Sequence, residues 1–515
     1  MIAHLIAPGC EVAVIGAGAM GSGIAQVAAR AGHPVRLFDT RPDAVERAIV
    51  QIRAQFGRLV EKGRMTAAQR DAASARLQGA ASLAELRGAA LVVEAVVEDL
   101  AVKRSLFAQL EDVVDARCIL ASNTSSISIT ALAARLARPG RMVGMHFFNP
   151  AAVMELVEVV SGLATDEPVA VAVFDLVRAW GKQPVHARST PGFIVNRVAR
   201  PFYAEGLRLL LERAADVATL DALLREAGGF RMGPFELMDL IGHDVNLAVT
   251  RSVFEAFYGD PRFMPSIIQQ ELVDGGRLGR KSGRGFYDYT EGVAPPAAHS
   301  EAPAPVPAAV VLGGDPDAPD PTTARLLGRL EAAGTAITRH RLTPQGACGL
   351  HCGGAAIYLT DGRSATERAA ADGHPDTVLF DLFADGATRI ALARADQCSD
   401  AAYHAAVGLM QAAGFTVSRI DDVPGMVVMR TVAMLANEAA DTVHQGVCSA
   451  QAVDLAMRKG VNYPQGPLAW AESIGLGQVA TVLANLAASY GDGRYRVAQL
   501  LRRKVAAHGR FHERT

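Results

Sequence analysis

Two groups of residues in the first third of the chain have the types and spacing needed for chemistry on a bound nucleotide. The first is a glycine-rich segment, 16–21, that reads Gly-Ala-Gly-Ala-Met-Gly. A turn of this kind brings backbone N–H groups close to the phosphates of a dinucleotide. The second is His146 with Glu158 twelve residues later, a pair that supplies a base able to move a proton. Hydride chemistry on an alcohol or a ketone needs both groups.

Each glycine of the segment has a separate role in the expected phosphate-binding turn. Gly16 permits the tight turn, Gly18 lets the backbone approach the pyrophosphate, and Gly21 lets the following helix pack on the strand. An apolar run leads into the turn and a helical pattern leads out of it, which is the context that the motif requires. The residues predicted to surround the phosphates are Gly16, Gly18, Ala19, Met20 and Gly21.

The carboxylate of Asp39 predicts which dinucleotide is preferred. Asp39 ends the second predicted strand, 18 residues after Gly21. At that place a carboxylate accepts hydrogen bonds from both ribose hydroxyls and repels a 2′-phosphate, which favours NAD over NADP. Arg41 lies nearby and leaves some use of NADP open.

Four polar residues follow three further predicted strands. Glu98 follows one strand, Asn123 and Ser125 follow the next, and His146 follows a third. The carboxyl ends of parallel strands meet at one edge of a sheet, and ligands collect beyond that edge. We therefore expect these side chains to lie together beside the glycine turn, although each one alone is equally consistent with a cap or a turn residue.

Glu158 is a candidate partner for His146. It lies on a predicted strand that a turn through Asn149 and Pro150 would bring back beside the histidine. A carboxylate there orients the imidazole and stabilises its protonated form. The alternative is a surface glutamate, and Glu155 shows that glutamates are available nearby.

Composition and charge limit the classes of protein that this chain can belong to. Its 515 residues are too many for one core, so two to four domains are expected. The 51 basic and 53 acidic residues nearly cancel, which provides no broad field for nucleic acid or an anionic membrane. The start lacks a signal-peptide pattern, and no apolar run approaches the roughly 18–20 residues of a membrane helix. We expect a cytoplasmic protein.

The six cysteines predict neither a disulfide framework nor a metal site. They are spread over the whole chain, unlike the dense pattern of small secreted domains. Cys348 and Cys352 flank His351, which suggests zinc, but the spacing lacks a second pair of ligands. We predict no metal ion.

Residues 1–188 predict a doubly wound α/β sheet. Apolar runs rich in valine and isoleucine alternate with helical patterns, as expected for parallel strands that are covered on both faces. The predicted strands are 12–15, 35–38, 91–97, 119–122, 142–145 and 156–160.

Residues 189–290 predict an all-α domain, followed by a linker. Thr190 is predicted to cap the first helix, with Pro191 in its first turn. The segment 291–307 is rich in proline and alanine, and we predict a semi-rigid spacer that does not pack.

Residues 308–418 predict a reduced Rossmann-like domain. The segment opens with an apolar strand and two glycines, but residues 315–321 then read Asp-Pro-Asp-Ala-Pro-Asp-Pro. Acids repel phosphate and prolines lack the N–H groups that would bind it. We predict that this domain holds no dinucleotide.

Residues 419–515 repeat the first helical domain at an offset of 233. Pro424-Gly425 corresponds to Pro191-Gly192, and matches in the same register continue for some fifty residues. The repeat provides an internal control, because Met429 stands where the first copy has Asn196. The amide of Asn196 could reach over the cofactor cleft. We predict one active site per chain, with the second copy structural.

Taken together, these elements resemble the L-3-hydroxyacyl-CoA dehydrogenases, in particular the long bacterial members with a reduced Rossmann domain and a second helical domain. These members include 3-hydroxyadipyl-CoA and 3-hydroxybutyryl-CoA dehydrogenases. The motifs that carry the resemblance are 16–21, 93–98, 122–126, 146–150, 156–159, 190–197 and 283–287.

The resemblance implies an activity and a set of roles. The expected reaction is the reversible, NAD-dependent oxidation of a (3S)-3-hydroxyacyl-CoA to a 3-oxoacyl-CoA, in β-oxidation or in phenylacetate catabolism. His146 would be the catalytic base and Glu158 its partner, while Ser125 and Asn196 would contact the substrate oxygen. Single-copy members pair through their helical domains, so the two copies here would mimic that dimer, with further homo-oligomers left open. In addition to the glycine turn, the NAD site would include Asp39, Glu98, Lys103, Asn123, Ser125 and Asn149.

Two other functions remain open at this point. One is an NAD-dependent dehydrogenase of free hydroxy acids or sugar acids on the same scaffold, similar to the gulonate dehydrogenases. Comparing acetoacetyl-CoA with free acetoacetate as substrates would distinguish such an enzyme from a 3-hydroxyacyl-CoA dehydrogenase. The other is a non-catalytic NAD-binding scaffold protein, which the intact first half of the chain argues against. The length of the acyl group, and whether it ends in a carboxylate, is not indicated by any residue.

Overall fold

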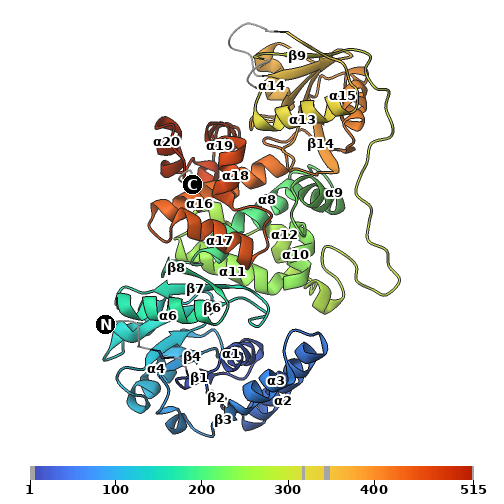
Figure 1. Cartoon of the computed structure of the whole chain (residues 1–515). Coiled ribbons are helices and arrows are strands. Elements are labelled where there is room, and N and C mark those ends of the chain that lie inside the picture. Colours follow the sequence, from blue (N-terminus) through green and yellow to red (C-terminus); the bar gives the residue numbers. More distant parts are fainter. Residues whose placement is uncertain (1–5, 8, 316–318, 341–347, 513–515) are drawn as a thin grey trace. The chain divides into compact units, whose positions relative to one another are not determined.

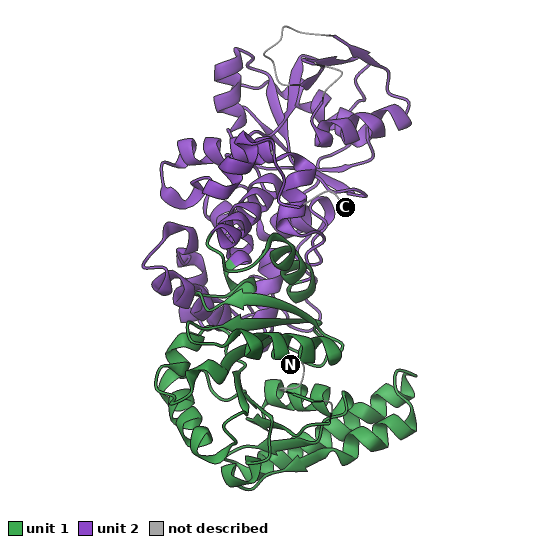
Figure 2. Ribbon diagram, turned by 60° about the vertical axis from the view of Figure 1, so that its left-hand side comes forward, with its two compact units in different colours: residues 1–197, 445–461 green, residues 198–444, 462–515 purple. Residues whose placement is uncertain are grey.

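Figure 1 shows the computed structural model of the chain, which describes residues 6–7, 9–315, 319–340 and 348–512. Its contacts divide the chain into two compact units. The first comprises residues 1–197 with 445–461, and the second comprises residues 198–444 with 462–515 (Figure 2). The second unit therefore contains most of both helical stretches and the α/β segment between them.

The first unit is built on an eight-stranded sheet in the order β3-β2-β1-β4-β5-β6-β7-β8. All neighbouring strands are parallel except β6 and β7, which are antiparallel. The central strands are buried along their whole length, which explains their continuous apolar runs. The strands are β1 (Val12–Ile15), β2 (Val35–Phe38), β3 (Leu77–Gly79), β4 (Leu91–Glu94), β5 (Ile119–Ser122), β6 (Met142–Phe147), β7 (Leu156–Ser161) and β8 (Gln183–Arg188).

The predicted sheet is confirmed, with corrections at its margins. β3 and β8 were not predicted, because one is three residues long and the other alternates buried and exposed side chains. β4 ends at Glu94, three residues earlier than expected. β6 continues through Phe147, so His146 lies inside a strand and does not follow one. A residue inside a strand has a fixed partner on the neighbouring strand, so His146 has a defined partner on β7.

Helices complete the first unit, and one of them comes from far along the chain. α17 (Ala450–Gly460) belongs to the repeated segment, yet it packs against β7 and β8. A Cβ atom on Gly460 would lie 2.6 Å from a side-chain atom of Leu156 on β7, so the glycine allows this close approach. The other helices are α1 (Ala19–Arg30), α2 (Pro42–Glu61), α3 (Ala67–Ala75), α4 (Leu100–Val113), α5 (Ile129–Ala133), α6 (Glu167–Ala179) and α7 (Val195–Val198).

The predicted helix cap at Thr190 is wrong. Residues 191–194 form a turn in which Gly192 and Phe193 have positive φ angles of 73° and 48°, and α7 begins only at Val195. Left-handed backbone conformations of this kind are incompatible with a helical first turn.

The second unit contains the helical repeat in the predicted register. α10 and α18 begin at equivalent prolines and are each followed by an equivalent glycine, Gly242 and Gly475, with φ angles of 98° and 107°. One residue is lost further on, so that α12 and α20 are related by an offset of 232. The helices are α8 (Arg200–Leu211), α9 (Val217–Ala222), α10 (Pro234–Ile241), α11 (His243–Ala256), α12 (Ile267–Asp274), α16 (Val428–His444), α18 (Pro467–Ile474), α19 (Leu476–Tyr490) and α20 (Gln499–Ala506).

Reciprocal ion pairs join the two copies inside this unit. Arg262 of the first copy lies 3.1 Å from Glu438 of the second, and Arg494 of the second lies 4.0 Å from Glu205 of the first. Glu205 and Glu438 are equivalent in the repeat, and so are Arg262 and Arg494. Arg430 adds a bond of 2.7 Å to Glu205, and neither side chain is more than 1% exposed. Each copy thus offers the same residues to the other, as in an isologous interface.

A second, mixed sheet has the order β10-β9-β11-β12-β13-β14-β15, with α13 (Pro321–Ala332), α14 (Ala365–Asp372) and α15 (Asp400–Ala412) packed around it. The predicted acidic turn lies partly outside the described residues, at 316–318. The carboxylate of Asp320 caps α13 by accepting from Thr322 N and Thr323 N at 2.9 Å. An acid therefore occupies the helix start. The strands are β9 (Val310–Gly313), β10 (Ile337–Arg339), β11 (Gly349–Cys352), β12 (Ala355–Leu359), β13 (Thr377–Phe380), β14 (Arg389–Arg394) and β15 (Thr416–Arg419).

The prediction that the linker does not pack is wrong. Glu301 N donates to Val417 O at 2.8 Å, and Ala304 N donates to the side chain of Gln411 at 2.8 Å. The hydroxyl of Tyr403 donates to Glu301 at 3.0 Å. The prolines keep this segment extended, which leaves its other backbone groups free to bond to the neighbouring strand and helix.

Replacing Glu205 tests the importance of the ion pairs between the copies. Glu205→Gln leaves the buried Arg430 with only part of its negative charge partner, so we expect the free energy of unfolding to fall by about 3–5 kcal/mol. Denaturant titration measures this. The exposed pair of Glu331 and Arg339 provides the control, since Glu331→Gln should change stability by about 0.5 kcal/mol or less. Equal effects of the two substitutions would contradict the prediction.

Candidate active site

His146 and Glu158 are direct neighbours on the antiparallel strands β6 and β7. They are register partners in the ladder, so their side chains lie on the same face of the sheet. The imidazole Nδ1 lies 2.6 Å from Glu158 Oε2. His146 is 5% exposed and Glu158 is fully buried. The pairing predicted from the sequence is therefore observed, and it results from the extension of β6 past the expected end.

The second oxygen of Glu158 is also occupied. Oε1 accepts hydrogen bonds from Ile194 N and Val195 N, both at 3.0 Å, at the start of α7. These bonds hold the carboxylate in place while Oε2 accepts the Nδ1 proton of His146. Nε2 makes no hydrogen bond within the described chain and is left as the acceptor nitrogen. The ring is flanked by Phe148 and Phe193, with centroid distances of 4.5 and 5.8 Å.

Ser125 and Asn196 are brought together at the same edge of the sheet. Asn196 Nδ2 donates to the backbone oxygen of Ser125 at 3.3 Å. Glu98 Oε1 accepts from Ser125 N at 3.0 Å and from Thr124 Oγ1 at 2.6 Å, which fixes the turn after β5. Burial alone would raise the pKa of Glu98, but the hydrogen bonds and the charge of Lys103 lower it, so the carboxylate stays ionised.

The remaining predicted cofactor residues differ in their surroundings. Asn123 Oδ1 accepts from Phe147 N at 2.8 Å, which ties the end of β5 to the strand that carries His146. Asn149 is exposed. Lys103 is 1% exposed and its ammonium lies 2.5 Å from Glu94 and 3.3 Å from Glu98. Its charge is therefore used to hold the carboxylate that shapes the Ser125 turn.

Sequence reasoning missed Glu94, which is fully buried at the end of β4. It accepts from Lys103, from Val96 N at 2.7 Å and from Ser122 Oγ at 2.6 Å. A signal was present, because a carboxylate inside an apolar run of a buried strand requires partners. Glu94 links two neighbouring strand ends of the candidate site.

The glycine turn has room for a dinucleotide where the motif requires it. A Cβ on Gly16 would lie 2.4 Å from Ala95 O, and one on Gly21 would lie 1.8 Å from Gly16 O, so the fold itself needs these two glycines. A Cβ on Gly18 would meet nothing within 4 Å. Gly18 is also the N-cap of α1 and offers no side chain, which leaves the first N–H groups of the helix free for phosphate.

Asp39 lies beside this turn in an ionised state. Its carboxylate accepts from Ala17 N at 2.9 Å and from Arg41 N at 3.0 Å. Burial opposes ionisation, but these bonds and the Arg41 guanidinium lower the pKa of Asp39. The residues present thus fit an NAD molecule, with a charged acceptor where its ribose hydroxyls would lie.

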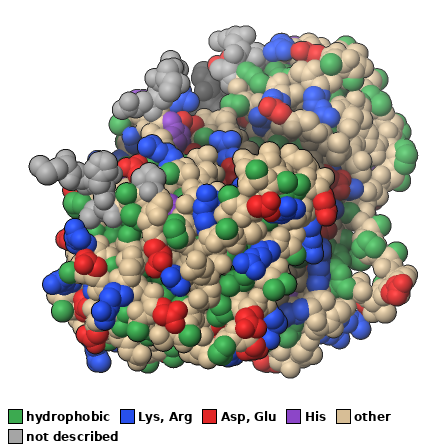
Figure 3. Space-filling model, turned by 60° about the horizontal axis from the view of Figure 1, so that its bottom comes forward, with side chains coloured by type: hydrophobic (Ala, Val, Ile, Leu, Met, Phe, Trp, Pro, Cys, Tyr) green, Lys and Arg blue, Asp and Glu red, His purple; other side chains and the backbone are tan. Residues whose placement is uncertain are grey.

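Two observations concern metal ions and membranes, and both are limited to the described part of the chain. No group of three or more His, Cys, Asp or Glu side chains that could hold a metal ion is found there. None of the helices described is both long and apolar enough to cross a membrane. On the face drawn in Figure 3, basic and acidic side chains are interspersed.

The second sheet has neither member of the His–Glu pair at the corresponding place. β13 and β14 are antiparallel neighbours, like β6 and β7, but Phe380 stands opposite Leu392 in their ladder. Asp381 follows and accepts from Val427 N at 2.9 Å and Val428 N at 2.7 Å. These are the equivalents of Ile194 and Val195, so a buried carboxylate is kept at the helix start without a histidine beside it.

Comparison with known proteins shows the family. Residues 11–190 match the model of the 3-hydroxyacyl-CoA dehydrogenase NAD-binding domain. Residues 192–289 and 425–515 match the C-terminal domain of the same family, and residues 357–424 match the 3-hydroxybutyryl-CoA dehydrogenase reduced Rossmann-fold domain. The chain therefore belongs to the 3-hydroxyacyl-CoA dehydrogenase family. It is an NAD-dependent oxidoreductase that acts on 3-hydroxyacyl-CoA.

Relatives of two lengths are found. The 3-hydroxyadipyl-CoA dehydrogenase of Escherichia coli K12 is 45% identical over 96% of this chain and 97% of its own length. The probable 3-hydroxybutyryl-CoA dehydrogenase of Bacillus subtilis is 41% identical over 55% of this chain and 98% of its own. The crystal structure of a 3-hydroxybutyryl-CoA dehydrogenase from Escherichia coli K12 matches with a TM-score of 0.88 and 43% identity, over 97% of this chain and 98% of that one.

A substitution at Gly18 separates the needs of the ligand from those of the fold. Because a Cβ there touches nothing in the protein, Gly18→Ala should lower stability by no more than about 1 kcal/mol, the cost of a poorer N-cap. We expect NADH binding, measured by fluorescence titration, to weaken at least about tenfold, since the methyl group lies where the pyrophosphate approaches. Gly57→Ala, inside α2 with open space around it, is the control and should bind NADH normally. Unchanged NADH affinity in Gly18→Ala would contradict this placement.

Proposed function

We propose that this enzyme oxidises (3S)-3-hydroxyacyl-CoA with His146 as the catalytic base. His146 Nε2 takes the proton of the 3-hydroxyl group, and Glu158 stabilises the imidazolium that forms. NAD, when bound, supplies the acceptor for the C3 hydride. The observation that carries the proposal is the buried 2.6 Å pair of Nδ1 with Glu158, which leaves Nε2 as the acceptor nitrogen.

Ser125 and Asn196 are proposed to hold the substrate oxygen. Their positions support this, because the Asn196 amide reaches the Ser125 backbone and Glu98 fixes the turn on which Ser125 lies. Two donors aimed at one oxygen stabilise the charge that it carries during reaction. Asp39, Glu98, Lys103, Asn123 and Asn149 are proposed to surround the cofactor, Lys103 by positioning Glu98.

The acyl group is proposed to be short. Several relatives that match over nearly their whole length are named for butyryl or adipyl groups, and a structure from Ralstonia eutropha is of an (S)-3-hydroxybutyryl-CoA dehydrogenase, 39% identical over 55% of this chain and 99% of that one, with a TM-score of 0.53. The name of the Ralstonia eutropha protein also supports the (3S) configuration proposed here. The six cysteines are all free, which supports a reducing compartment such as the cytoplasm.

Replacing His146 tests the proposed base. His146→Gln should lower kcat for acetoacetyl-CoA reduction by about 10²–10⁴-fold, because the proton donor and acceptor is lost, while NADH affinity stays close to that of the wild type. His186→Gln provides a matched control, since His186 lies on β8 and stacks on Phe174. If His146→Gln kept near-wild-type turnover, the role proposed for His146 would be wrong.

The two helical copies are proposed to replace the dimer of single-copy relatives. The reciprocal pairs Arg262–Glu438 and Arg494–Glu205 support this, because each copy presents the same residues to the other. Light scattering tests it. We expect any assembly to use surfaces other than the face of α8 that packs on α16, and an obligate dimer formed through the first helical copy would contradict the proposal.

A further inference from the structure

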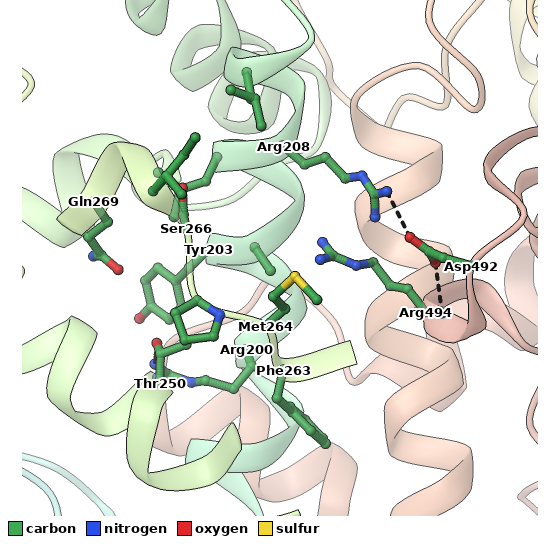
Figure 4. Close-up of a pocket in the computed structure, with 15 residues that line it drawn as sticks. Arg200, Tyr203, Arg208, Thr250, Phe263, Met264, Ser266, Gln269, Asp492 and Arg494 are labelled. Atoms are coloured by element: carbon green, nitrogen blue, oxygen red, sulfur yellow. Dashed lines mark hydrogen bonds and ion pairs between the residues drawn. The ribbon is translucent and has the colours of Figure 1, made fainter. Parts of the chain in front are cut away.

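A cavity of about 260 Å³ lies within the second unit, and none of the residues that line it is assigned above to catalysis (Figure 4). It is lined by α8, by Thr250 of α11 and by the segment that enters α12. Three guanidinium groups reach its wall, those of Arg200, Arg208 and Arg494, but only one carboxylate does, that of Asp492. The positive charge of this lining is therefore in excess.

Arg200 is the source of the excess. It is 5% exposed, and its guanidinium donates to Thr250 Oγ1 at 3.1 Å. Its Nε is buried without a hydrogen-bond partner, and no carboxylate pairs with it among the described residues. Burial lowers the pKa of Arg200, while the two tyrosines near it offset this only in part. A buried cation without an anion is unfavourable unless a ligand supplies one.

The other two arginines have partners. Arg208 lies 3.2 Å from Glu212 and 2.9 Å from Asp492, an interaction that is visible in Figure 4. Arg494 lies 4.0 Å from Glu205. Both of these charges are paired with carboxylates, whereas the guanidinium of Arg200 lies over the ring of Tyr203, 4.8 Å from its centroid, and has no carboxylate partner among the described residues.

The repeat shows that the fold does not require this arrangement. At the position of Arg200 the second copy has Ala433, and at the position of Thr250 it has Leu483. Both residues of the second copy are apolar and fully buried. The same helices therefore pack well with an apolar core at this place, and the first copy keeps a polar cavity that its own stability does not explain.

The lining indicates the class of ligand. A planar guanidinium pairs with a carboxylate through two parallel hydrogen bonds. The rest of the wall includes Leu207, Phe263 and Met264, which suit an aliphatic chain. The volume is below the roughly 300–1,000 Å³ that drug-sized ligands occupy, so the ligand is small. We propose that this cavity binds a carboxylate carried on a short aliphatic chain, with Arg200 as its charge partner and Thr250 beside it.

Such a carboxylate has two sources. It is either a free short-chain acid, bound separately from catalysis, or the far end of a dicarboxylic acyl group on the substrate. The second source rests on the proposed function. Arg200 lies four residues after Asn196 in the chain, and a relative is named for an adipyl group, which ends in a carboxylate.

Calorimetric titration with adipate tests the site without any turnover. We expect adipate to bind the wild-type protein and neutral adipamide not to bind. Affinity for adipate should fall at least about tenfold in Arg200→Met, because charge-assisted hydrogen bonds are lost. Arg251→Met is the matched control: Arg251 is exposed, follows Thr250 and does not line the cavity. Thr250→Leu, which introduces the residue of the second copy, is a second variant should Arg200→Met fold poorly.

Kinetics with two acyl-CoA substrates distinguish the sources. If the carboxylate belongs to the substrate, kcat/KM for 3-hydroxyadipyl-CoA relative to 3-hydroxyhexanoyl-CoA falls at least about tenfold in Arg200→Met and not in Arg251→Met. An unchanged ratio together with Arg200-dependent binding of adipate identifies a separate ligand. Each of these results supports the site.

Two results would contradict the proposed site. In the first, neither the affinity for adipate nor the ratio of the two kcat/KM values changes in Arg200→Met and Thr250→Leu. In the second, adipate does not bind the wild-type protein and the ratio of kcat/KM values is unchanged in the variants. Failure of the proposed function would look different. In that case the wild-type protein would turn over no acyl-CoA, while the adipate titration, which needs no turnover, would still show whether binding depends on Arg200.

Discussion

The fully buried carboxylate of Glu158 is the interaction on which the active site depends. One of its oxygens receives the Nδ1 proton of His146, and the other receives the N–H groups of Ile194 and Val195. A buried carboxylate is costly unless its oxygens are bonded. Here the same bonds that meet this cost also orient the imidazole and place the helix segment that carries Asn196. Two of the groups to which we assign catalytic roles are therefore held in place by one side chain.

A second group of buried ionic contacts holds the turn that carries Ser125. Glu94 and Glu98 share the ammonium of Lys103, and between them they fix the turn after β5 on which Ser125 lies. Asn123 then ties the end of β5 to Phe147, next to the histidine. Most of the polar residues at this edge of the sheet bond to one another. Rigid positioning of this kind is what preorganised catalysis requires.

The duplicated half shows which features serve folding and which serve chemistry. Asp381 keeps a buried carboxylate at the start of the equivalent helix, and burial raises its pKa to about 6, yet no histidine lies beside it. The glycine turn is replaced by an acid that caps its helix. Ala433 likewise replaces the charged Arg200. The second copy keeps the packing and lacks these polar groups, which supports the roles proposed for them in the first copy.

The sequence by itself determined the doubly wound sheet, the glycine turn and the repeat, because glycine spacing, apolar runs and a constant offset between similar segments can be read without knowing any contact. It did not determine where β6 ends, that the linker packs, or that the turn at 191–194 precedes the helix. Those depend on hydrogen bonds between segments far apart in the chain. The tertiary structure alone decided that His146 and Glu158 face each other, since strand register is a property of two segments. It also revealed that Arg200 is buried without an anion, because burial and the absence of a partner cannot be read from a single stretch of residues.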